Sequence, residues 1–149
     1  MKTILVVLGI LAIGAPARAQ LCGPDVRLTV KHIASKSTLE QTPPKDQARL
    51  YVLDPASELT GGLQMKISVD REWAGVLQAK SYFVVPLSSG HHEICMKVMN
   101  DIRSVSIDAV AGATYFLEAA TIPTELRQVD EADGKLLLEK CRRTEFTEK

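Results

Sequence analysis

The clearest pattern in the chain is an alternation of apolar and polar residues between Gln64 and Met99. From Met65 to Val69 the odd positions are apolar and the even ones polar, which is the period of a half-buried β-strand. This stretch predicts two successive hairpins. The first joins 65–69 to 73–77 around Asp70-Arg71-Glu72, and the second joins 82–87 to 92–99 around Ser88-Ser89-Gly90.

Weaker alternation extends the β pattern to both sides of this stretch. Further strands are predicted at 26–33, 48–53, 103–110 and 114–121, and the last two are expected to pair around Ala111-Gly112. The sidedness of 26–33 indicates an edge or outer position. Pro123 is expected to close the β region. The chain is therefore predicted to be all-β, a β-sandwich of about seven strands.

The pattern changes after Asp130, where a short C-terminal helix is predicted. Asp130 is a suitable helix N-cap, and Asp133 would lie near the positive end of the helix dipole. Residues 136–140 would continue the helix despite Gly134. Residues 142–149 are charged and are expected to form a flexible tail. A single sandwich domain would then span residues 20–141.

The first 19 residues have the features of a cleavable secretory signal. Lys2 gives a positive start, residues 4–13 are almost entirely apolar, and Ala17-Arg18-Ala19 is a small-x-small cleavage site. The apolar run is too short for a membrane anchor, which needs roughly 20 residues. A lipoprotein is the alternative, because Cys22 lies near the junction, but the residue before it is Leu21 rather than a small one. Export to the periplasm or cell surface is therefore expected, with no transmembrane segment in the mature chain.

The mature chain is the size of one domain and is close to neutral. Removing Lys2 and Arg18 from the 18 basic side chains leaves 16, against 18 acidic ones. About 130 residues are enough to bury a single core. Nucleic-acid binding is disfavoured, because it needs a concentrated positive surface.

Several segments together resemble a known bacterial family. They are Cys22-Gly23-Pro24, ARLYVLD (48–54), VDREWAGVLQAKSYFVVPLSSGHHEIC (69–95) and AGATYFLEA (111–119). This combination resembles the exported family called domain of unknown function 2846 (DUF2846), from about Cys22 to Leu138. The core is also similar in rhythm to PEGA-type surface modules, although those usually place Gly where this chain has Arg71. The resemblance implies an immunoglobulin-like or prealbumin-like β-sandwich in the bacterial envelope, and it implies no reaction.

The three cysteines of the mature chain predict one disulfide if the compartment is oxidising. A Cys22–Cys95 bond is favoured, because it would tie a loose N-terminus to a central strand. It would close a loop of about 70 residues, worth on the order of 4 kcal/mol in the chain-entropy model. Cys141 would remain a free, exposed thiol, while pairings of Cys141 with Cys22 or Cys95 stay open. A redox enzyme is disfavoured, because no Cys-x-x-Cys is present.

His91 and His92, close to Cys95, Met96 and Met99, raise the hypothesis of a copper or zinc site. Strand geometry argues against it, since His91 and Cys95 would lie about 13 Å apart and metal ligands lie about 2.0–2.3 Å from the ion. Both histidines are expected near a hairpin turn, and neither a metal nor another cofactor is expected. A small metal-binding protein or enzyme centred on His91 and His92 is the alternative function.

Trp73 and Tyr82 are the aromatic candidates for a binding surface, together with His91 and His92. Burial between the sheets is the ordinary alternative for such aromatic residues. No hydrolase or zinc-protease signature such as Gly-x-Ser-x-Gly or His-Glu-x-x-His occurs. The sequence therefore favours a non-catalytic envelope module that binds an unidentified protein or cell-envelope component.

Overall fold

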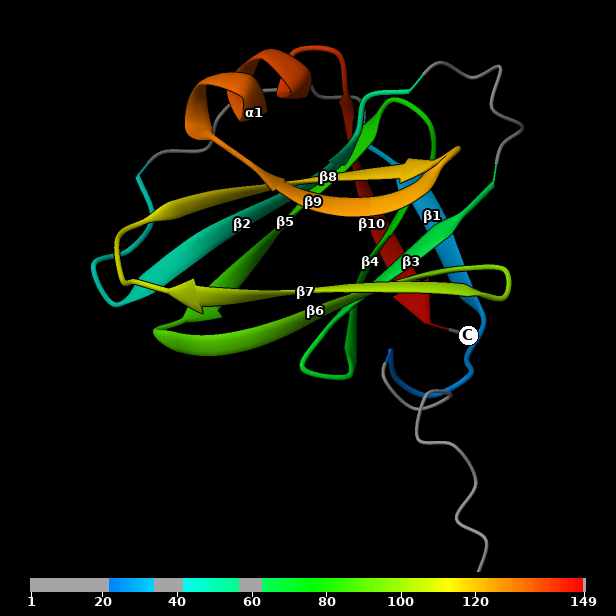
Figure 1. Ribbon diagram of the computed structural model, residues 1–149, viewed down its shortest axis with the longest axis horizontal. Helices are drawn as coiled ribbons and strands as arrows, with labels where there is room; N and C mark the ends of the chain where they lie inside the picture. Colours follow the sequence, from blue (N-terminus) through cyan, green and yellow to red (C-terminus); the bar gives the residue numbers. More distant parts are fainter. Residues whose placement is uncertain (1–21, 34–41, 57–62, 149) are drawn as a thin grey trace, which may run out of the picture.

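The structure is a computed structural model that describes residues 22–33, 42–56 and 63–148. Two β-sheets pack face to face, and a short helix covers the outer side of the larger sheet (Figure 1). The predicted all-β sandwich with a short helix near the C-terminus is confirmed. In chain order the elements are β1 (Leu28–His32), β2 (Gln47–Asp54), β3 (Met65–Val69), β4 (Glu72–Leu77), β5 (Ser81–Ser88), β6 (Gly90–Val98), β7 (Asp101–Ala109), β8 (Thr114–Thr121), β9 (Thr124–Val129), α1 (Glu131–Leu138) and β10 (Arg142–Glu148).

The larger sheet has six strands and the smaller one has four. The order in the larger sheet is β1-β10-β5-β2-β8-β9, and the order in the smaller sheet is β4-β3-β6-β7. The pairs β10–β5 and β2–β8 are parallel, and the other neighbours are antiparallel. β1 lies at an edge, as the one-sided pattern of its sequence predicted.

The predicted hairpin between β3 and β4 is confirmed. Val69 pairs with Glu72, so the turn consists of Asp70 and Arg71 alone. Both have positive φ, 50° and 71°, which is the requirement of a type I′ turn. This turn matters below, because it aims the Asp70 carboxylate at β6.

The two other predicted hairpins are wrong, because the chain changes sheet at both expected turns. β5 pairs with β2 and β10 in the larger sheet, whereas β6 pairs with β3 and β7 in the smaller one. β7 and β8 are separated in the same way. A hairpin and a crossover between two sheets bury the same alternate positions, so alternation alone does not distinguish them.

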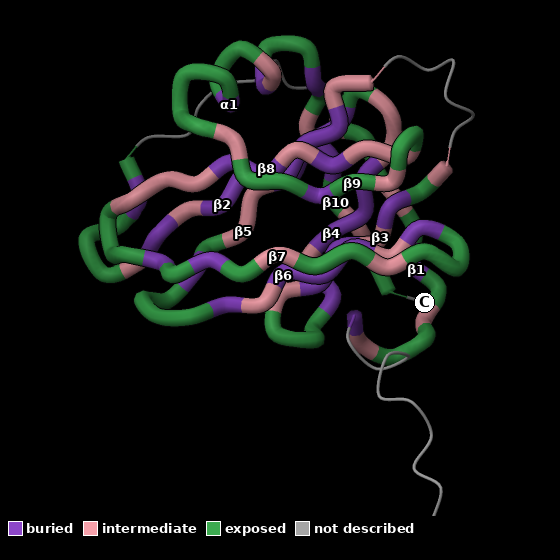
Figure 2. Tube along the Cα trace, viewed as in Figure 1, coloured by how far each residue is buried: buried purple, intermediate pink, exposed green. Residues whose placement is uncertain are grey.

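The main core lies between the two sheets, and Figure 2 shows the buried stretches along the strands. Its members are the inward-facing apolar residues of both sheets: Ala48, Leu50, Val52, Met65, Ile67, Leu77, Phe83, Leu87, Ile94, Met96, Val98, Ile107, Ala109, Leu117, Ala119 and Leu126. A second cluster lies under α1 and contains Tyr51, Tyr82 and Phe116. β2 therefore contributes to a core on both of its faces, as expected for a central strand.

The helix begins where the sequence predicted. Asp130 is the N-cap, and its carboxylate accepts a hydrogen bond from the Asp133 N–H. Gly134 lies directly on the Phe116 ring, where a Cβ atom would overlap the ring carbons. The glycine that weakens the helical pattern thus permits close contact between α1 and the larger sheet.

The prediction of a flexible tail at 142–149 is wrong for the residues that the structure describes. Arg142–Glu148 form β10, which pairs with β5 at Arg142 and Arg143 and with β1 from Thr144 to Glu148. The strand also joins the two sheets, since the Thr144 hydroxyl lies 3.4 Å from the Val76 carbonyl and 3.2 Å from the Tyr82 carbonyl. The β region also continues past Pro123 into β9.

Candidate functional site

The Cys22–Cys95 disulfide is present, with a Cα–Cα distance of 5.1 Å. It holds residues 22–26 against the outer face of the smaller sheet, where Trp73 and Val76 of β4 are buried with it. The staple spans 73 residues of sequence, so it joins the start of the described chain to the middle of the fold. The predicted pairing is confirmed.

Trp73 fixes this N-terminal segment and does not form an exposed platform. Its side chain is buried, with 9% of the residue exposed, and its indole N–H donates to the Pro24 carbonyl at 2.8 Å. The Lys66 ammonium donates to the Val26 carbonyl at 2.6 Å and lies 5.8 Å from the indole centroid. The prediction of Trp73 as a binding surface is wrong, because the segment that follows Cys22 covers this face.

Tyr82 is also unsuited to a binding surface. It is 1% exposed and lies in the cluster under α1, with its ring 6.2 Å from that of Tyr51. Tyr51 in turn stacks on Phe116 at 5.1 Å. Helix α1 buries all three rings, so the aromatic residues of the larger sheet serve packing.

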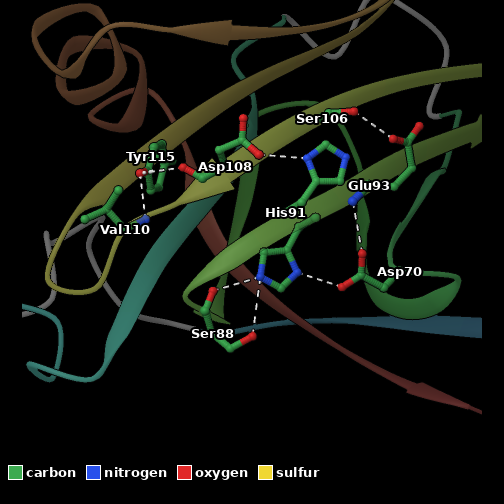
Figure 3. A network of polar contacts seen from close by, with 9 residues as sticks. Asp70, Ser88, His91, Glu93, Ser106, Asp108, Val110 and Tyr115 are labelled. Atoms are coloured by element: carbon green, nitrogen blue, oxygen red, sulfur yellow. Dashed lines mark hydrogen bonds and ion pairs between the residues drawn. The ribbon is translucent and has the colours of Figure 1, made fainter.

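His92 lies at the end of the main core and joins two turns of the chain. Its Nδ1 lies 2.6 Å from Asp70 Oδ2, and its Nε2 lies 2.8 Å from the Ser88 carbonyl and 3.4 Å from the Ser88 hydroxyl. The other Asp70 oxygen accepts from the Glu93 N–H at 3.0 Å. We call Asp70, Ser88 and His92 the His92 clasp. Figure 3 labels Asp70 and Ser88, the two residues that His92 contacts.

The electrostatics of the clasp favour a charged pair. Burial alone would lower the pKa of His92, but hydrogen bonds to Asp70 and to the Ser88 carbonyl outweigh it and raise the pKa above its ordinary 6.5. Burial alone would raise the pKa of Asp70, but the hydrogen bonds from the Glu93 N–H and His92 outweigh it, so the pKa of Asp70 lies below its ordinary 3.8. The nearest partners of the two ring nitrogens, a carboxylate and a carbonyl, only accept hydrogen bonds. The geometry therefore favours a doubly protonated ring, the imidazolium, at pH values below the raised pKa of His92.

This arrangement contains the residue types of a Ser-His-Asp triad, but its geometry differs from one. In a triad, the histidine Nε2 must accept the proton of the serine hydroxyl. Here the closer partner of Nε2 is the Ser88 carbonyl, at 2.8 Å, and the Ser88 hydroxyl lies at 3.4 Å. The His92 clasp therefore acts as a structural link between the β3–β4 turn and the β5–β6 crossover.

His91 points to the opposite face of β6 and is exposed. Its Nδ1 lies 2.8 Å from the Asp108 carboxylate on β7, directly across the strand pair. The next outward pair, Glu93 and Ser106, is hydrogen bonded at 2.8 Å (Figure 3). Because the strand directs His91 and His92 to opposite faces, it does not bring them together at one site. In the described part of the chain, no three His, Cys, Asp or Glu side chains are grouped as metal ligands.

Cys141 is a free thiol, as predicted, but its predicted exposure is wrong. It is buried under α1, where its sulfur lies 3.5 Å from the Asp54 carbonyl. Burial raises the pKa of Cys141 to about 12, and the Asp54 carboxylate adds to that shift. The thiol is therefore protonated and inert at neutral pH.

An open cavity of about 570 Å³ lies where β1 ends and where β5 and β10 begin. Sequence analysis missed it, because its residues come from four separate segments. The lining consists of His32, Pro55, Ala79, Lys80, Lys140 and Arg142, and we call it the basic cavity. A weak sequence signal exists in the basic run Lys140-Cys141-Arg142-Arg143, which the predicted elements divide between the end of the helix and the charged tail.

The comparisons give no relatives from which a site could be transferred. Neither a family model, nor a curated protein, nor a solved structure matches this chain. Across the residues that the structure describes, no helix is long and apolar enough to cross a membrane. The predicted signal at residues 1–19 lies outside the described residues. The disulfide is compatible with an exported protein.

Proposed function

We propose that the protein is exported to the bacterial cell envelope and acts there as a non-catalytic binding module. The secretory features of residues 1–19 and the resemblance to DUF2846 support export. The Cys22–Cys95 staple supports an oxidising compartment, because disulfides persist outside the cytosol. The binding partner of the protein is a component of the periplasm or cell surface.

The observation that carries the non-catalytic role is the hydrogen bonding of His92. The clasp places a serine, a histidine and an aspartate together, yet the nearest partner of each histidine nitrogen is a hydrogen-bond acceptor, the Asp70 carboxylate or the Ser88 carbonyl. An imidazolium in this state cannot accept a proton from a nucleophile. Two of the cysteines form the staple, and Cys141 is a buried thiol.

An esterase assay tests this role at the clasp. The mature protein, Ser88→Ala and the exposed-serine control Ser106→Ala are each incubated with p-nitrophenyl acetate. The expected result is no hydrolysis that distinguishes the three proteins. Hydrolysis by the wild type and Ser106→Ala that is lost in Ser88→Ala would show that the clasp is a catalytic triad.

The alternative, a copper or zinc protein centred on His91 and His92, is tested separately. Calorimetric titration with Cu²⁺ and Zn²⁺ is expected to give the same weak heats for the wild type and for His91→Gln. Stoichiometric binding that His91→Gln or His92→Gln abolishes would replace the binding-module proposal with a metal-binding one.

A further inference from the structure

Among the residues that the structure describes, the lining of the basic cavity contains three cationic side chains and no acidic one. Lys80, Lys140 and Arg142 face it together with His32. Within the described residues, no ion pair joins any of the three cations to a carboxylate. Like charges gathered without a counterion repel one another, and an anion placed among them relieves that repulsion.

Backbone contacts fix the chain segments that carry Lys80 and Arg142. The Arg142 N–H donates to the Lys80 carbonyl at 2.8 Å, which joins the β4–β5 turn to the start of β10. That turn is closed by Ser81, whose hydroxyl donates to the Gln78 carbonyl at 2.6 Å and accepts from the Gln78 N–H at 2.8 Å. Lys80 has a φ of 56°, in the left-handed region, so the turn has a fixed shape. The cavity is therefore largely preformed, as binding sites commonly are.

His32 adds a polar group to the same wall. Its Nε2 lies 3.0 Å from the Gln78 side-chain oxygen, so Nε2–H donates there and Nδ1 is left for a ligand. His32 pairs with Thr144 across the β1–β10 ladder, which fixes the position of its backbone. The wall thus offers one directional group beside three positive charges.

The chemistry of this lining fits a phosphate group better than a single carboxylate. A guanidinium binds two phosphate oxygens at once, and lysines supply point charges to the remaining oxygens. A phosphate monoester carries close to two negative charges at neutral pH, which matches a site with three cations more closely than one charge does. The volume of about 570 Å³ lies within the range of small-molecule pockets and leaves space for an organic group beside the phosphate.

We propose that the basic cavity binds a small phosphate-bearing molecule, either free or as the exposed headgroup of a lipid. The proposal rests on the binding function proposed above and names the ligand class. Arg142 holds the phosphate, and Lys80 and Lys140 neutralise it. Pro55 and Ala79 form the less polar part of the lining, against which the organic part of the ligand packs.

Calorimetric titration of the mature protein with glucose 1-phosphate tests the proposal, with glucose as the neutral control. A second arm measures co-sedimentation with phosphatidylcholine vesicles that contain phosphatidic acid. The test variant is Lys80→Gln with Arg142→Gln. The matched control is Arg27→Gln with Lys45→Gln, which removes the same charge from exposed positions outside the cavity. Lys140→Gln repeats the test without altering the turn or the strand.

Binding of either phosphate form, but not of glucose, is expected. The cavity variant should weaken binding about tenfold or more, Lys140→Gln about threefold, and the control less than twofold. The arm that binds identifies the source of the phosphate. No binding in either arm, or equal weakening by both double variants, would overturn the proposal and leave the non-catalytic function standing. Release of inorganic phosphate from glucose 1-phosphate would instead contradict the non-catalytic function.

Discussion

His92 and Asp70 are a titratable pair at the end of an apolar core, so their contribution to stability depends on pH. The pKa of His92 is raised by folding, so its contribution is complete below about 6.5 and is lost as pH rises through the folded pKa. The pKa of Asp70 is lowered, so its contribution is complete above 3.8 and is lost as pH falls through the folded value. The clasp therefore stabilises most between these limits.

Replacing His92 by Gln should lower the free energy of unfolding by about 1 kcal/mol near pH 5.5 and by less near pH 8.5. The estimate is small because the Asp70 side chain is 52% exposed and solvent screens the pair. Urea denaturation at the two pH values measures the difference. His91→Gln is the control, since its partner Asp108 is exposed and the loss should stay below about 0.5 kcal/mol. A loss that is equal at both pH values would contradict the charged clasp.

At the scale of residues, the sequence predicts on which face of a strand a residue lies, but not which residues distant in sequence it contacts. The Cys22–Cys95 pairing was predictable, because three cysteines allow only three pairings and the secretory features of residues 1–19 predict an oxidising compartment. The role of His92 was not, since Asp70 lies 22 residues away and meets His92 only through the type I′ turn. The basic cavity could not be predicted either, because its lining residues are far apart in the sequence.

At the scale of elements, the contact between α1 and the larger sheet depends on one glycine. Gly134→Ala would normally stabilise a helix by about 0.5–1 kcal/mol. Here the added methyl group would overlap the Phe116 ring. We therefore expect the free energy of unfolding to fall by about 1–3 kcal/mol, as is usual for overpacking. Thermal denaturation measures it, and the exposed position Leu136→Ala should change stability by less than about 0.5 kcal/mol. A more stable Gly134→Ala would show that α1 is not docked on Phe116.

The strands were predictable where one face carries a continuous apolar row, and not elsewhere. β2 to β8 all lie close to their predicted positions, because each contains at least two buried apolar residues. In β10, Thr144 is buried and Phe146 packs against the apolar cluster beside the disulfide, and the other residues are charged or polar. It is a strand because β1 provides a partner for its backbone, which no local pattern in its own sequence records.

At the scale of the whole molecule, the staple joins the N-terminal segment to the smaller sheet, and Leu28 of β1 and Phe146 of β10 pack in the same apolar cluster. Changing Cys22 and Cys95 together to Ser should lower the free energy of unfolding by about 2–5 kcal/mol, the usual cost for a small secreted domain. Guanidinium denaturation measures the loss. Wild-type protein treated with reductant should show a similar loss, because Cys141 forms no disulfide. Unchanged stability in both experiments would show that residues 22–26 are not needed to close the fold.

The central claim, an exported module held by one disulfide with one buried thiol, is tested most directly by intact-mass spectrometry. The exported protein is alkylated with iodoacetamide without reductant, once folded and once in denaturant. We expect a chain that begins at Gln20, two hydrogens below the mass of the fully reduced form. It should carry no alkyl group when folded and one, on Cys141, after denaturation. A chain that retains residues 1–19, or that takes up three alkyl groups, would contradict the account.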